Sequence, residues 1–141
     1  MNKELKIINE VYYWKDKLCL PYFVLDINNR TKYAGFVEEY QDGIAKLTLN
    51  IKSIKKYQPI DVLSIIFHEF GHIVTGTHLQ SFKGNELDAE ILAERWNLDM
   101  ICKYCTAEQY QDYYDGMRKA VLDKYWKKFP VHQKAFEKIY I

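Results

Sequence analysis

The sequence predicts an α+β fold, a small antiparallel three-stranded sheet packed with helices, formed by residues 1–141 as a single domain. Apolar residues recur at helical intervals near the start of the chain, alternate with polar residues before residue 51, and return to helical intervals beyond residue 59. Strands that follow one another between helices are typical of α+β domains. A chain of this length can bury one core of modest size.

The first part of the chain predicts one helix and then three strands. Apolar residues three or four positions apart indicate a helix over about residues 3–18, which Pro21 ends. The next segment alternates between strand-forming runs and the turn sequences NNR and QDG. Its last run, IAKLTLNI, alternates apolar and polar residues most clearly, so that strand should be half buried. The strands are expected at residues 21–27, 32–40 and 44–51.

The rest of the chain predicts four helices. Pro59 suits a first helical position, Asp61 adds negative charge to the first turn, and Gly76 is a stop signal. The residues between them are mostly apolar, which predicts a buried helix. Asn85 is a good N-cap for the following helix. The last three helices are expected at about residues 85–103, 106–128 and 131–139.

The charges of the chain are nearly balanced, with 20 basic and 19 acidic residues and a net charge of +1. This balance predicts no general polyanion-binding surface, so we expect no nucleic-acid partner. The amino-terminal segment lacks the apolar core of a signal peptide, and no apolar segment has the length of a membrane span. Three cysteines fit a reducing compartment. We therefore expect a cytoplasmic protein without a membrane partner, and the sequence leaves its oligomeric state open.

The run HEFGH at residues 68–72 carries the strongest chemical signal. His68 and His72 lie four residues apart, so on a helix both imidazoles can reach one metal ion. Glu69 would lie beside the water that this ion polarises. The pattern is that of zinc metallopeptidases, in which Zn²⁺ acidifies a water molecule and the glutamate accepts its proton. The alternative is a pair of core histidines bonded to backbone carbonyls.

A catalytic zinc ion usually takes three protein ligands and keeps one position for water. The residues downstream leave three candidates open for the third ligand: His78, Glu86 and Glu90. His78 has the spacing of the motif HExxHxxGxxH, although threonine stands where that motif has glycine. Glu86, Glu90 and Glu94 form a row on one helix face, where like charges repel unless a metal ion or lysines lie nearby.

The segment from about residue 60 to 105 resembles the ImmA/IrrE-type zinc metallopeptidases, which are common on phages and integrative elements. The resemblance is carried by HEFGHIVTG and by the later sequence EILAERWNL. In the latter, Glu90, Ala93 and Trp96 match the family pattern ExxA(N/D)xW. The family more often has Asn or Asp at the position of Glu94. A second, overlapping copy of the pattern starts at Glu86, one turn earlier.

The resemblance implies a minimal zincin-like metallopeptidase domain with a gluzincin site. Its zinc ligands would be His68, His72 and Glu90. Glu69 would be the general base, and Glu94 would accept a hydrogen bond that orients one ligand imidazole.

These expectations favour a zinc metallopeptidase, an HExxH hydrolase that cleaves peptide bonds of a protein or peptide substrate. By resemblance, that substrate would be a regulatory protein of the same mobile element. One alternative is a SprT/WLM-like protease that acts on DNA-bound proteins with His78 as third ligand, but the neutral charge counts against it. Another is a non-catalytic interaction protein that zinc only stabilises.

Two parts of the expected mechanism have weaker signals in the sequence. The first is the donor that would stabilise the oxyanion. The second is the edge strand that would hold an extended substrate by backbone pairing, for which we expect residues 44–51. The candidate donors are His132, Tyr104, Tyr110, Tyr113 and Tyr114.

Overall fold

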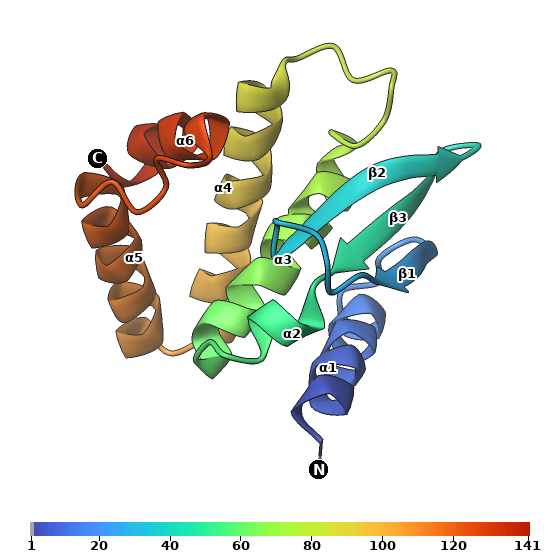
Figure 1. Ribbon diagram of the computed structural model, residues 1–141, viewed down its shortest axis with the longest axis horizontal. Helices are drawn as coiled ribbons and strands as arrows, with labels where there is room; N and C mark the ends of the chain where they lie inside the picture. The colour runs from blue at the N-terminus through green and yellow to red at the C-terminus, as the bar shows by residue number, and fades with distance from the viewer. Residues whose placement is uncertain (1) are drawn as a thin grey trace.

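The computed structural model describes residues 2–141 and confirms the α+β class. Within these residues, one helix precedes three strands and five helices follow them (Figure 1). The helices are α1 (Lys3–Lys17), α2 (Ile51–Ile54), α3 (Pro59–Thr75), α4 (Glu86–Tyr104), α5 (Ala107–Leu122) and α6 (Pro130–Tyr140), and the strands are β1 (Phe23–Ile27), β2 (Gly35–Gln41) and β3 (Ile44–Leu49).

The helices expected from the sequence are present, with two differences. The short helix α2 was not predicted, and it begins where the side chain of Asn50 accepts a hydrogen bond from the backbone of Ser53. The helix predicted to reach residue 128 ends at Leu122. Lys124, just beyond that end, has a left-handed backbone with φ of 59°, so the chain turns before α6 begins.

The sheet is mixed, which corrects the expected antiparallel arrangement. β3 lies in the centre, pairing antiparallel with β2 through a tight turn and parallel with β1. The segment 28–34 crosses the end of β3, a distance of two strand spacings or about 10 Å. Backbone hydrogen bonds from Asn28 to Leu49 and from Asn50 to Ala34 hold this crossing in place. The sequence NNR resembles a hairpin turn, but the whole segment is long enough to separate β1 from β2.

The strand order also corrects the expected substrate-binding strand. The predicted strand 44–51 corresponds to β3, which has a partner on each side and therefore offers no free edge. Among the described strands, the edges of the sheet belong to β1 and β2.

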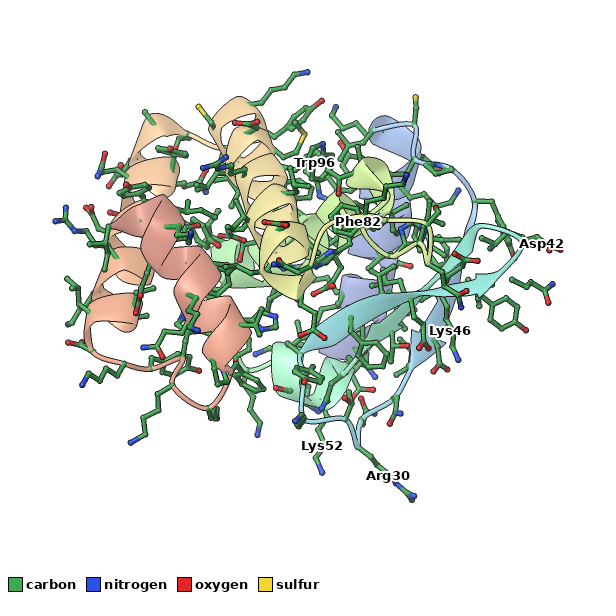
Figure 2. The ribbon with its side chains drawn as sticks, turned by 90° about the horizontal axis from the view of Figure 1, so that it is seen from above. Arg30, Asp42, Lys46, Lys52, Phe82 and Trp96 are labelled. Carbon is green, nitrogen blue, oxygen red and sulfur yellow. The ribbon has the colours of Figure 1, made fainter. Side chains whose placement is uncertain are left out.

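Helix α3 lies at the centre of the molecule. Figure 1 and Figure 2 show the sheet on one side of α3 and helices α4 to α6 on the other. Phe67 of α3 is fully buried, with its ring 5.0 Å from Trp14 of α1 and 6.2 Å from Trp96 of α4. Phe70 packs 5.7 Å from Phe23 of β1. The apolar sequence before and within HEFGH therefore joins the sheet to the helices.

Three of the charged residues labelled in Figure 2, Arg30, Asp42 and Lys52, lie at the periphery. Asp42 stands at the tip of the β2–β3 hairpin, and Arg30 and Lys52 point outward beside the crossing segment. In the described part of the chain, no helix has both the length and the apolar character that a bilayer crossing needs.

Helices α3 and α4 approach each other closely at Gly71 and Ala93. A Cβ atom added to Gly71 would lie 2.6 Å from the carbonyl oxygen of Ala93 and 2.9 Å from its Cα. Real Cβ atoms essentially never come this close to other atoms. The glycine of HEFGH is therefore a packing requirement, because any side chain there would push the two helices apart.

We expect Gly71→Ala to destabilise the protein by about 1–3 kcal/mol, the usual cost of an overpacked core. Gly116→Ala is the matched control, because nothing lies within 4 Å of a Cβ added at this exposed position of α5. Removing a helical glycine there should stabilise the protein by up to about 1 kcal/mol. Urea unfolding of both variants measures the difference. Equal stability of the two would show that α3 and α4 can separate without cost.

Candidate metal centre

His68, Glu69 and His72 are all buried on α3. Each has between 7% and 8% of its surface exposed. The two imidazole rings lie one helical turn apart, with their centroids separated by 5.1 Å. The helix ends at Thr75, and the left-handed backbone of Gly76, with φ of 72°, turns the chain back toward the last helical turn.

Glu90 and Glu94 approach this site from α4. Asn85 and Asp88 fix the start of this helix through a capping box, in which each side chain accepts a hydrogen bond from the backbone of the other. The acidic row predicted from the sequence then runs inward: Glu86 is exposed, Glu90 is partly buried, and Glu94 is 1% exposed. The row therefore enters the interface with α3, where the two histidines lie.

The carboxylate of Glu90 lies between the two imidazoles. Its Oε2 is 2.7 Å from Nε2 of His68, and its Oε1 is 3.1 Å from Nε2 of His72. Ligand atoms of the three residues all lie within 4.8 Å of one another. Ligand atoms in a tetrahedral zinc site are about 3.4 Å apart, given bonds of 2.0–2.2 Å. A small outward shift of these side chains would therefore admit a divalent ion.

Protein groups hold the second nitrogen of each ring. Nδ1 of His68 lies 2.8 Å from Oε1 of Glu94, and Nδ1 of His72 lies 2.7 Å from Oγ1 of Thr77. Donation from Nδ1 leaves the lone pair of Nε2 directed toward the centre, as in metal-ligating histidines. Sequence analysis missed Thr77, and its only signal was a hydroxyl directly after the stop glycine Gly76.

The carboxylate of Glu94 is fully paired inside the protein. Its Oε2 accepts hydrogen bonds from the hydroxyls of Tyr113, at 2.9 Å, and Tyr140. Its Oε1 accepts from Nδ2 of Asn97 at 3.1 Å as well as from His68. Four donors make a buried carboxylate tolerable. Because the Tyr113 hydroxyl is committed to Glu94 behind the centre, it cannot serve as the oxyanion donor.

Neighbouring charges and burial shift the pKa values of this site in opposite directions. Burial alone would lower the pKa of His68, but Glu90 and Glu94 raise it well above its ordinary value. Burial alone would raise the pKa of Glu90, but His68 and His72 hold it well below its ordinary value. Burial raises the pKa of Glu69, which makes its carboxylate a stronger base. Without a metal ion, the raised pKa of His68 therefore favours its protonated form, which places an imidazolium beside the two carboxylates.

A cavity of about 370 Å³ opens onto this centre and is lined by Glu69, His72 and Glu90. Residues of β2 form part of one wall, and a Cβ added to Gly35 would lie 3.3 Å from Cγ of Glu69. The start of α6 contributes His132, whose Nε2 lies 3.2 Å from Oε2 of Glu90. Three tyrosines named as possible oxyanion donors, Tyr104, Tyr110 and Tyr114, do not line this cavity.

The other two candidates for the third ligand lie near the centre but outside the ligand group. Glu86 lines the cavity one turn before Glu90 and is exposed. His78 also lines the cavity, and its Nδ1 is 3.1 Å from the backbone oxygen of His72. The group whose donor atoms converge is that of His68, His72 and Glu90.

No model of a known protein family matches this chain, and neither a curated protein nor a solved structure matches it. The chemistry of the centre therefore has to be inferred from its donor set. Two imidazole nitrogens and one carboxylate oxygen suit Zn²⁺, and they also bind other divalent ions. The residues fit such an ion, because the donors converge and the second nitrogen of each imidazole is anchored.

We expect Glu90→Gln to weaken zinc binding by more than the 10–100-fold that loss of an outer hydrogen-bond partner costs. The amide keeps the size of the side chain but removes the charge that a divalent ion requires. Glu86→Gln and His78→Gln are the matched controls and should bind zinc like the wild type. Competition with a chromogenic chelator measures the affinities. A comparable loss in His78→Gln would instead place His78 among the ligands.

The metal-free protein should lose stability as the pH rises above about 6.5, the ordinary pKa of an unfolded histidine. Below that pH, His68 is protonated in both states and its ion pairs contribute in full. Above it, the raised pKa keeps the folded His68 protonated while the unfolded one is neutral, so the contribution falls. Urea unfolding with a chelator at pH 6 to 9 tests this. An equal slope in His68→Gln would contradict it.

Proposed function

We propose that this chain is a zinc-dependent metallopeptidase of the ImmA/IrrE type that its motifs resemble. The observation that carries the proposal is the convergence of His68, His72 and Glu90 next to an open cavity that Glu69, His72 and Glu90 line. Structural zinc sites usually have four protein ligands and no open position, whereas catalytic sites have three. A three-donor group that borders a cavity supports the catalytic alternative.

Glu69 would act as the general base and then as the general acid. A zinc ion held by the three ligands would supply an acidified water molecule and a polarised peptide carbonyl. Glu69 accepts a proton from the water while the water oxygen bonds to the carbonyl carbon. It then delivers that proton to the peptide nitrogen as the C–N bond breaks. The products are a carboxylic acid and an amine.

The edge strand β2 is the best candidate to hold the substrate. Gly35, Phe36 and Val37 line the cavity next to Glu69, and the outer edge of β2 has no partner among the described strands. An extended peptide could add to this edge through backbone hydrogen bonds, which would bring one of its carbonyls toward the centre. The family resemblance favours a regulatory protein of the cytoplasm as substrate.

The SprT-like alternative has no support in the geometry, because His78 lies outside the ligand group. If a zinc ion only stabilised the fold, replacing Glu69 would change no catalytic activity, since a structural site needs no base.

We expect Glu69→Gln to lower peptide cleavage by about 10²–10⁴-fold, the usual contribution of a general base. Zinc content and the urea midpoint should stay near their wild-type values, because the amide has the size of the carboxylate and ligates no metal. The assay follows cleavage of unfolded casein by mass spectrometry, with Glu86→Gln as the matched control on the same cavity. Equal cleavage by the wild type and Glu69→Gln would remove the support for an enzyme.

A further inference from the structure

We propose that His132 is a further catalytic residue, which donates a hydrogen bond to the carbonyl oxygen of the peptide bond that is cleaved. This inference rests on the proposed peptidase function and assigns the oxyanion donor that the reaction needs.

His132 reaches the centre from a part of the chain far from HEFGH. It lies in the first turn of α6, and its Nε2 is 3.2 Å from Oε2 of Glu90. The side chain is 28% exposed and lines the cavity. It is not part of the group formed by His68, His72 and Glu90, whose donor atoms converge within 4.8 Å. Its imidazole is therefore next to the centre and open to a substrate, without completing the ligand set.

Aromatic side chains from three segments fix the ring of His132. Trp126 stacks on it with an interplanar angle of 13° and a centroid distance of 6.3 Å. Phe136, one turn further along α6, lies 6.0 Å away, and Tyr33, just before β2, lies 6.3 Å away. A donor that packing holds in place needs little reorganisation when negative charge develops on the substrate.

His132 and Glu69 lie on different walls of the cavity. Glu69 is next to Gly35 of β2, whereas His132 belongs to α6. Figure 1 shows β2 and α6 on opposite sides of the α3–α4 pair. A peptide carbonyl between these walls would have the base on one side and the imidazole on the other. Attack and charge stabilisation require this separation, because the water and the oxyanion occupy different positions around the carbonyl carbon.

The imidazole also carries its proton on the correct nitrogen. Nε2 faces a carboxylate oxygen of Glu90, which can only accept a hydrogen bond, so the proton is placed on Nε2. That N–H already points toward the centre. A shift from Glu90 to a substrate oxygen would exchange one acceptor for another.

Two variants test the proposal. His132→Phe keeps the aromatic packing but removes the donor, and His132→Gln restores a donor through its amide. Both are loaded with zinc, and cleavage of casein-derived peptides is compared with the wild type. Binding of an N-phosphoryl dipeptide, whose tetrahedral phosphoryl group imitates the oxyanion, is measured by calorimetry. This second measurement does not depend on turnover.

We expect His132→Phe to lower kcat about 100-fold, the usual cost of losing one oxyanion donor, with little change in KM or zinc affinity. Binding of the phosphoryl dipeptide should weaken by a similar factor, and His132→Gln should recover part of both losses. Loss of zinc in His132→Phe would make His132 a ligand and overturn the proposal, as would wild-type kcat and dipeptide affinity in this variant.

The outcome also separates this inference from the proposed function. If the wild type cleaves peptides and His132→Phe cleaves them equally well, the peptidase stands and the role of His132 falls. If the wild type cleaves nothing but binds the phosphoryl dipeptide in a His132-dependent way, the peptidase falls and His132 remains an oxyanion-binding donor. If the wild type neither cleaves nor binds, both proposals are overturned.

Discussion

The close contact between α3 and α4 determines the rest of the site. Gly71 allows the backbone of Ala93 to approach where any side chain would collide. At this separation the carboxylates of Glu90 and Glu94 reach the imidazoles directly. Hydrogen bonds and metal bonds tolerate only a few tenths of an ångström. If α3 and α4 lay further apart, the same residues would be present but the carboxylates would no longer reach the imidazoles. Gly71 therefore sets the distance on which these contacts depend.

The buried carboxylate of Glu94 connects the carboxyl-terminal helices to the same site. Tyr113 of α5 and Tyr140 of α6 both donate to its Oε2, while His68 donates to its Oε1. The orientation of the His68 imidazole, a candidate metal ligand, therefore depends on Tyr113 and Tyr140 of the last two helices. α6 contributes on two sides, because its end pairs with Glu94 and its beginning carries His132 into the cavity. The bond from Tyr140 to the buried Glu94 thus holds α6, the helix whose first turn lines the cavity.

The sequence was most informative where one local pattern carried both structure and chemistry. HEFGH could be placed on a buried helix because its histidines, its apolar neighbours and Gly76 all indicate the same element. Strand order was not predictable in this way, since it depends on how the segment 28–34 crosses β3 and not on the strands themselves. Thr77 and the place of His132 beside Glu90 were also not predictable, because the fold creates those contacts.

Charge balance explains why a divalent ion suits this buried site better than a proton. Glu94 accepts four hydrogen bonds and donates none, as an ionised carboxylate does, and Glu90 is held ionised by the imidazoles. A proton on His68 supplies one positive charge beside these two carboxylates. An ion of charge +2 would supply twice the positive charge of that proton. Uncompensated charge is costly away from water, so the negative charge of these carboxylates favours binding of a cation.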